Sequence, residues 1–202
     1  MWEMVLSGGP VMVPLLVCSL VALTVVIDRA VFWIALLRRR KPALLEEVMT
    51  LCESGDWEAI RLKTAGTRDH TIKIIITGIL HREFSMTKAM ESAAADQVKR
   101  MRRYMGILDT MITVAPLLGI FGTVTGIIQS FEALGAVGVE RPVAVTAGIA
   151  QALITTAAGL GIAILSVIPY NFFDSLCEQA ALRIEKYATS LEIVYEKLAG
   201  SK

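Results

Sequence analysis

Three long apolar runs dominate the chain and predict helices that cross a membrane. They occupy residues 10–37, 110–134 and 143–173, and the cores of the second and third contain no Asp, Glu, Lys or Arg. Each run is longer than the roughly 20 residues that a helix needs to cross the hydrocarbon core of a bilayer. The first run is too long for the apolar part of a signal peptide and no basic segment precedes it, so we expect a retained transmembrane helix.

Basic residues are distributed unevenly among the connecting segments. Segment 38–109 holds most of them and opens with four in a row, Arg38 to Lys41, while the tail 174–202 adds more. Segment 1–9 has none, and loop 135–142 has only Arg141. Because Lys and Arg accumulate on the cytoplasmic side, we expect segments 1–9 and 135–142 outside and segments 38–109 and 174–202 in the cytoplasm, which is an N-out, C-in orientation.

The sequence also predicts helices in the cytoplasmic segments. Pro42 suits the first position of a helix, and the residues at 54–56 and 66–67 predict breaks. From about Thr87 a helical pattern continues without a breaker into the second span, which predicts one continuous helix. The tail carries an apolar stripe at spacings of three and four, formed by Leu176, Ala180, Ile184, Tyr187, Leu191, Val194 and Leu198. We expect this stripe to extend the third span and to pack on segment 38–109 or on a neighbouring copy.

Composition and motif content exclude several function classes. Apolar residues make up 54% of the chain and the formal net charge is +1, so no charge excess indicates a nucleic-acid partner. The three cysteines lack the spacing of a metal or redox site. The chain shows no nucleophile with a base, no metal-ligand cluster and no phosphate-binding loop. We therefore expect no catalytic residue, no metal and no cofactor, and a protein that is not an enzyme.

Small residues recur at helical spacing along the second and third spans and lead to a threonine in each. The stripes are Ala115–Gly119–Thr123 and Gly148–Ala152–Thr156, flanked by Gly122, Gly126, Thr155 and Gly159. Such stripes allow helix backbones to approach closely, which is a common packing device in membranes. The same hydroxyls can instead line a polar pathway, because few other polar groups lie at this depth. Spacing alone leaves both interpretations open.

Gln151 and two prolines add polar character inside these spans. An amide in hydrocarbon needs hydrogen-bond partners, and Gln151 lies one helical turn from Thr155. Pro116 and Pro169 each remove a backbone hydrogen bond, which can kink the helix or free a carbonyl oxygen. The candidate pathway residues are therefore Thr123, Thr156, Thr155 and Gln151, and the candidate packing residues are Gly119, Gly122, Gly126, Gly148, Gly159, Pro116 and Pro169.

None of these pathway candidates can carry a proton by itself, because hydroxyls and amides do not titrate near neutral pH. The carboxylates Asp28, Asp109, Glu132 and Asp174 lie near span ends, where salt bridges or anchoring are the expected roles. A proton pathway at mid-span therefore requires a carboxylate from another chain. The alternative is a passive membrane scaffold or assembly protein, in which all these residues serve packing.

Two segments resemble the signatures of a known family. Residues 115–128, APLLGIFGTVTGII, and residues 148–160, GIAQALITTAAGL, are similar to the second-span and third-span signatures of the MotA/TolQ/ExbB proton channel family. The opening Gly8-Gly9-Pro10-Val11-Met12 and the later Val26-Ile27-Asp28-Arg29 resemble ExbB-type members. The resemblance covers essentially the whole chain and favours the three-span ExbB/TolQ branch over the four-span MotA branch.

The resemblance implies an assembly and a mechanism. Family members form homopentamers of long helices that extend into the cytoplasm and enclose single-span helices of an ExbD/TolR-like partner. An intramembrane Asp of that partner carries the proton, and the matching family threonines, here Thr123 and Thr156, face it. The family commonly has Glu where this chain has Gln151, so hydrogen bonding or packing is expected there instead of proton relay.

The implied function is conversion of the proton motive force into mechanical work on the cell envelope. The expected location is the bacterial inner membrane, in contact with lipid, with residues 1–9 and 135–142 in the periplasm. TonB-dependent outer-membrane transport with a TonB/TolA-like protein is one such process, and a TolQ-like or gliding-motor variant of the machinery is the alternative within the family.

Overall fold

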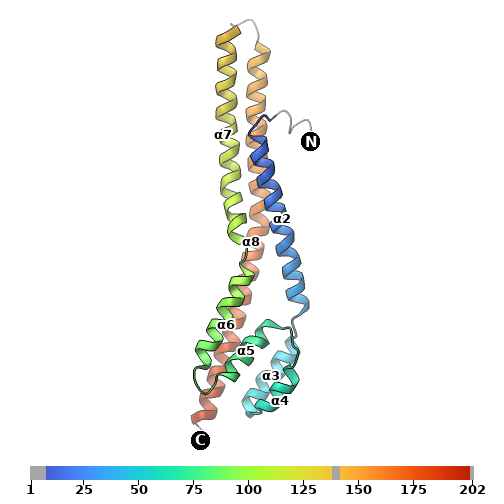
Figure 1. Cartoon of the computed structure of the whole chain (residues 1–202), viewed down its shortest axis with the longest axis vertical. Coiled ribbons are helices and arrows are strands. Elements are labelled where there is room, and N and C mark those ends of the chain that lie inside the picture. The colour runs from blue at the N-terminus through green and yellow to red at the C-terminus, as the bar shows by residue number, and fades with distance from the viewer. Residues whose placement is uncertain (1–7, 138–141, 201–202) are drawn as a thin grey trace. The chain divides into compact units, whose positions relative to one another are not determined.

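Every element of the computed structural model is a helix within the part of the chain that it describes, residues 8–137 and 142–200 (Figure 1). The helices are α2 (Met12–Arg38), α3 (Pro42–Ser54), α4 (Trp57–Thr64), α5 (His70–Leu80), α6 (Met86–Met101), α7 (Met105–Val137) and α8 (Pro142–Gly200). The predicted all-α class is thereby confirmed. Residues 1–7 of the predicted outer segment 1–9, and residues 138–141 of the predicted loop 135–142, lie outside the described residues.

Three helical stretches are long and apolar enough to cross a membrane, which confirms the predicted number of spans. They are Met12–Arg38, Met86–Glu132, which includes the short break between α6 and α7, and Thr146–Leu198. The third span and the tail form one uninterrupted helix, α8, so the tail extends the span as the apolar stripe predicts. Pro169 lies inside α8 and Pro116 inside α7, and both helices continue through their prolines.

The prediction of one continuous helix from Thr87 into the second span is wrong. Helix α6 ends at Met101 and α7 begins at Met105. Between them Tyr104 has a φ of 66°, in the left-handed region that residues with a side chain rarely adopt, and this conformation interrupts the helical backbone. The segment contains no Gly or Pro, so the local sequence carries no signal for the break.

The chain divides into two compact units. Unit 1 comprises Met1–Arg29 with Tyr104–Phe173, and unit 2 comprises Ala30–Arg103 with Asp174–Lys202. In unit 1 the beginning of α2 packs on α7 and α8 through buried Val11, Met12, Leu15 and Ala115. A second cluster of Ala22, Val25 and Leu108 continues this contact along α2.

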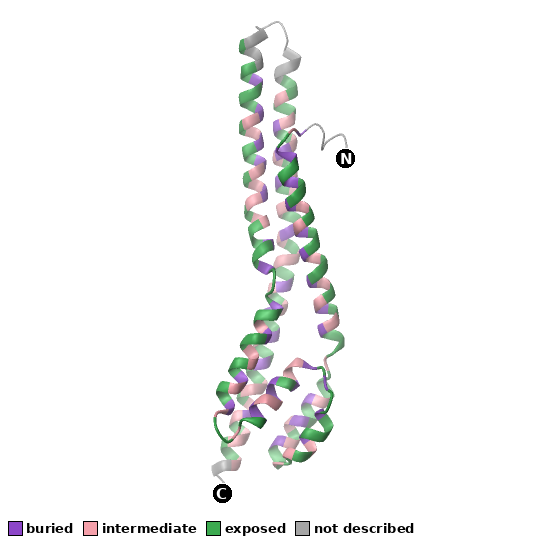
Figure 2. Ribbon diagram, in the orientation of Figure 1, coloured by how far each residue is buried: buried purple, intermediate pink, exposed green. Residues whose placement is uncertain are grey.

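Large apolar side chains cover the outward faces of the helices in unit 1. Leu20, Phe131 and Leu165 are examples, each with more than half of its surface exposed. In Figure 2 buried positions are a minority on α7 and α8, and exposed and half-buried positions occupy the remaining faces. Exposed apolar area on this scale is typical of a surface that contacts lipid or other protein.

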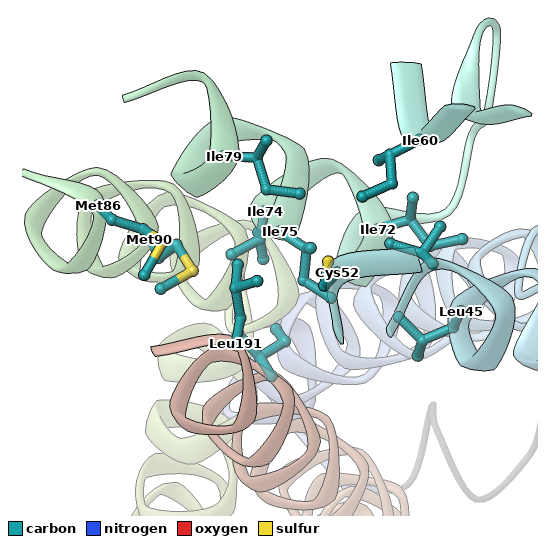
Figure 3. Packing of buried hydrophobic residues seen from close by; sticks show 12 residues of the cluster. Leu45, Cys52, Ile60, Ile72, Ile74, Ile75, Ile79, Met86, Met90 and Leu191 are labelled. Carbon is teal, nitrogen blue, oxygen red and sulfur yellow. The ribbon is translucent and has the colours of Figure 1, made fainter. Parts of the chain in front are cut away.

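Unit 2 has a core of large aliphatic side chains (Figure 3). Helix α5 contributes Ile72, Ile74, Ile75 and Ile79, while the surrounding helices add Leu45, Val48, Cys52, Ile60, Met86, Met90, Ile184 and Leu191. Ile184 and Leu191 belong to the predicted tail stripe, so the stripe packs on the chain's own middle segment.

Capping residues fix the helix boundaries of unit 2 where the sequence predicts breaks. Gly55 ends α3 with a φ of 72°, and Gly66 has a φ of 73° after α4. Asp56 begins α4 by accepting a hydrogen bond from the Ala59 amide at 3.0 Å. Pro42 stands at the start of α3, as expected for a residue without an amide hydrogen.

Candidate functional site

The candidate site lies where α7 and the first half of α8 run side by side in unit 1 (Figure 1). Three glycines of α7 face α8 at very short range. A Cβ atom added to Gly122 would lie 2.5 Å from Thr155 Oγ1, and one added to Gly119 would lie 3.0 Å from the Thr155 carbonyl oxygen. At Gly126 the added atom would lie 3.0 Å from the Cβ of Ala152. The two backbones therefore approach as closely as glycine permits.

Two glycines of α8 make the reciprocal contacts. A Cβ on Gly159 would collide with the Ala115 carbonyl oxygen and lie 3.1 Å from Gly119 Cα. A Cβ on Gly148 would collide with the hydroxyl of Ser130. All five glycines that the sequence marks as packing candidates thus lie in the contact between α7 and α8.

Thr123 and Thr156 meet in this contact, one from each helix. Their hydroxyl oxygens are hydrogen-bonded to each other. Thr123 Oγ1 also lies 3.2 Å from the carbonyl oxygens of both Gly119 and Ala152. Thr156 Oγ1 lies 3.1 Å from the Gly119 carbonyl oxygen. Both side chains are half-buried, so one side of the pair remains accessible.

The pair lies far from the charged residues at the ends of the helices. Thr123 stands fourteen positions after Asp109 and nine before Glu132 on α7, which at the helical rise is about 21 Å and about 13 Å. Thr156 stands eighteen positions before Asp174 on α8, about 27 Å along the axis. A polar pair at this depth contributes hydroxyls and no charge.

Thr155 and Gln151, the other two pathway candidates, have different surroundings. Thr155 is only 1% exposed, donates to the Ala152 carbonyl oxygen at 2.7 Å and packs against Gly122. The half-buried amide of Gln151 lies against Gly9, just before α2, where an added Cβ would collide with it. Gly9 also has a φ of 69°, a backbone conformation that glycine adopts more readily than other residues. These contacts give both residues a packing environment within one chain.

Two of the four carboxylates near the span ends form salt bridges, the role expected for them. Asp28 pairs with Arg29 at 2.6 Å, and Asp174 pairs with Arg102 at 3.5 Å. Arg29 was not predicted to be buried, yet it is 3% exposed and its guanidinium lies 5.6 Å from the centre of the Tyr104 ring. An arginine next to an aspartate at a span end carries no signal of such burial.

Two buried serines were also not predicted. Ser130 donates to the Gly126 carbonyl oxygen at 2.8 Å, and Ser166 donates to the Ile162 carbonyl oxygen at 2.7 Å. Each hydroxyl bonds to the carbonyl four residues earlier, a pattern that lets serine remain in an apolar helix. This bonding satisfies their polarity inside their own helix and leaves Thr123 and Thr156 as the hydroxyl pair that bridges α7 and α8.

The bridging pair can form hydrogen bonds with an outside group in either direction. Each hydroxyl has one proton and two acceptor lone pairs, and each has more than one acceptor within reach. A hydroxyl can therefore rotate to donate a hydrogen bond to an anion or to accept one from an acid, while its oxygen stays close to the same backbone carbonyls. The pair itself does not ionise near neutral pH.

The fold and this site define a class: a multi-pass α-helical membrane protein whose later spans form a close, uncharged, hydroxyl-bearing interface. The profile of the MotA/TolQ/ExbB proton channel family matches residues 68–186. The chain belongs to the MotA/TolQ/ExbB proton channel family, in its ExbB/TolQ-like branch.

Several relatives carry ExbB or TolQ names. The ExbB-like 3 protein of Synechocystis sp., named for biopolymer transport, is 34% identical over 199 residues, which cover 95% of this chain and 93% of the relative. The ExbB homolog of Methanothermobacter thermautotrophicus is 30% identical over 188 residues, 91% of this chain and 66% of its own. The TolQ protein of the Pseudomonas aeruginosa Tol-Pal system is 34% identical over 112 residues, 55% of this chain and 48% of its own.

Proposed function

We propose that this protein is the channel-forming subunit of a proton-driven motor that performs mechanical work on the cell envelope. Membership of a proton channel family and relatives named for biopolymer transport support the transport class. The observation that carries the proposal is the hydroxyl pair of Thr123 and Thr156, which joins two uncharged spans far from any charged residue of α7 and α8.

The pair acts on a carboxyl group that another chain supplies. An ExbD/TolR-like partner with one membrane span and an intramembrane Asp provides that group. When the Asp is protonated, its O–H donates to a threonine lone pair. When it is ionised, a threonine rotates its proton from a backbone carbonyl toward the carboxylate and lowers the cost, roughly 3 kcal/mol, of holding the charge at mid-span.

The assembly that we propose is a homopentamer enclosing the partner helices. The exposed apolar faces of the helices in unit 1 support association with other copies, with the partner and with lipid. The membrane potential supplies about 2.3 kcal/mol per elementary charge for each 100 mV, which is enough to bias the position of one helix against another. A TonB/TolA-like protein would carry the resulting motion across the envelope, as in TonB-dependent outer-membrane transport.

The proposed location is the inner membrane with the N-terminus and loop 135–142 in the periplasm. Support comes from the excess of Lys and Arg in segments 38–109 and 174–202. Cysteine labelling in spheroplasts tests this orientation. A cysteine at Gly138, which lies outside the described residues, should react from outside. Ser54→Cys, exposed at the end of α3, should react only after the membrane is opened, and external labelling there contradicts the orientation.

Threonine-to-valine exchange tests the pathway, because valine keeps the shape and removes the hydroxyl. Thr123→Val or Thr156→Val should leave expression and assembly unchanged and abolish ion-driven work in cells that carry the partner. Thr125→Val is the matched control, since Thr125 lies at the same depth but bonds only to carbonyls of its own helix, those of Phe121 and Gly122. We expect Thr125→Val to retain activity.

A passive scaffold is the second candidate, and one observation favours it. The hydroxyls of Thr123 and Thr156 are already bonded to backbone carbonyls and to each other, which is sufficient for a packing role. Full activity of both Thr→Val variants at normal protein levels would show that the two threonines serve packing. It would contradict the proposed threonine pathway. Thr155→Val and Gln151→Leu should have milder effects, since both residues lie in packing contacts.

A further inference from the structure

Two arginines from distant parts of the chain line the same cavities in unit 2. Arg40 follows the end of α2 by two residues, and Arg183 belongs to the tail part of α8. Both line a cavity of about 300 Å³, together with Asp69, Thr71 and other residues of α3 and α8. Both also line a smaller adjoining cavity that Asp69 and His70 share.

Asp69 has little remaining capacity to pair with these arginines. It is 5% exposed, and its Oδ1 accepts from the amides of Thr71 and Ile72 at 2.9 and 3.4 Å. Its Oδ2 accepts from the Lys41 amide at 2.7 Å. These bonds cap α5 and tie it to the start of α3, so the carboxylate holds the backbone together and its charge offsets at most one of the two guanidiniums.

The cavities are therefore electropositive. Within the described residues the side chains of Arg40 and Arg183 form no salt bridge and no hydrogen bond. Burial lowers the pKa of Arg40, the nearby charge of Arg183 lowers it further, and Asp69 opposes both effects. Burial, followed by the charge of Lys73, lowers the pKa of His70, which favours the neutral form of its ring.

Arg40 also follows a stretch of α2 with exposed apolar side chains. Along the last turns of α2, the side chains of Val31, Ile34 and Leu37 are exposed. Arg40 comes three residues after Leu37, just beyond the end of α2. Guanidiniums at the end of an exposed apolar stripe are well placed for the phosphate of a lipid whose acyl chains cover that stripe.

We propose that Arg40 and Arg183 together bind a phosphate group, with the Thr71 hydroxyl as a further donor in the same cavity. Guanidiniums bind phosphate oxygens through paired, charge-assisted hydrogen bonds, and a bound phosphate relieves the repulsion between the two arginines. The phosphate comes from the headgroup of an anionic lipid or from free inorganic phosphate. This site is independent of the threonine pair and of ion conduction.

Native mass spectrometry of the purified chain in mild detergent tests the site with phosphatidylglycerol as the probe. Arg40→Gln and Arg183→Gln should each lower the affinity for this lipid about tenfold, the effect of losing one charge-assisted contact. Arg38→Gln is the matched control: it removes the same charge at the end of α2 but lines neither cavity. Because Arg183 is exposed, its variant should fold even where Arg40→Gln does not.

A parallel titration with inorganic phosphate, followed by ³¹P NMR in lipid-free detergent, distinguishes the sources. Lipid binding that depends on both cavity arginines, with phosphate weak, identifies a headgroup site. Saturable phosphate binding that depends on the same arginines, with no retained lipid, identifies a free-phosphate site. An equal loss in Arg38→Gln, or binding of neither probe, overturns the proposal, since attraction to a basic segment would then account for any binding.

Discussion

Helix α8 takes part in two kinds of packing, one in each unit. In unit 1 its contact with α7 consists of glycines, alanines and threonines, with backbone atoms in near contact. In unit 2 its buried positions are large and aliphatic, such as Ile184 and Leu191, and they join a core built around the isoleucines of α5. One helix thus changes its packing chemistry along its length.

The difference follows from the solvent of each unit. Lipid is as apolar as a leucine side chain, so burying leucine gains little in a membrane, and close van der Waals contact with interhelical hydrogen bonds must hold helices together. Water penalises exposed apolar surface by about 25 cal/mol per Å², so large side chains stabilise a core most effectively there. The composition of each interface therefore indicates its solvent.

The largest effect should come from filling the narrow contact of unit 1. Gly122→Leu should separate α7 from α8 and abolish assembly, because even a Cβ at Gly122 would lie 2.5 Å from Thr155 Oγ1. Gly122→Ala should lower the melting temperature in detergent. Gly161→Ala is the control, since nothing lies within 4 Å of its added Cβ and alanine favours a helix. Equal melting temperatures for the two alanine variants would show that the contact is not close.

The core of unit 2 should be destabilised by the opposite change, the removal of side-chain volume. Leu191→Ala should lower the free energy of unfolding by about 2–5 kcal/mol, because the side chain is completely buried and its removal leaves a cavity. Ile193→Ala, two residues away and 61% exposed, should cost far less. Chemical denaturation measures both, and similar losses would mean that the tail does not pack on segment 38–109.

Much of this architecture can be predicted from the sequence, because apolar length and helix-breaking residues are strong signals. The span number, the breaks at Gly55 and Gly66, and the continuation of the third span into the tail all follow from local pattern. The break at Tyr104 does not, because its left-handed backbone occurs without Gly or Pro. Helix α5 was not singled out either, although Ile72, Ile75, Ile76 and Ile79 recur at the spacing of one helix face, because the helix is short.

The candidate site, too, could be predicted only in part from the sequence. Helical spacing placed the five glycines and the two threonines on their faces, and the structure brings those faces together. Spacing within one helix cannot tell which residue of α7 meets which residue of α8, so the direct bond between Thr123 and Thr156 was not predictable from it. The burial of Arg29 and the shared cavity of Arg40 and Arg183 also depend on contacts between segments distant in the chain.

The smallest loss of stability should come from removing the exposed salt bridge of unit 2. The charged pair of unit 1 is the comparison. Arg102→Gln removes a pair at 3.5 Å whose side chains are both more than 40% exposed, and it should cost less than about 0.5 kcal/mol because water already solvates both charges. Arg29→Gln leaves Asp28 without its partner and empties a buried position beside Tyr104, so it should cost about 2 kcal/mol. Melting temperatures of the two variants in the same detergent measure the difference. If Arg102→Gln lowered stability as much as Arg29→Gln, burial would not determine how much each salt bridge stabilises its unit. The two units would then differ only in their apolar packing.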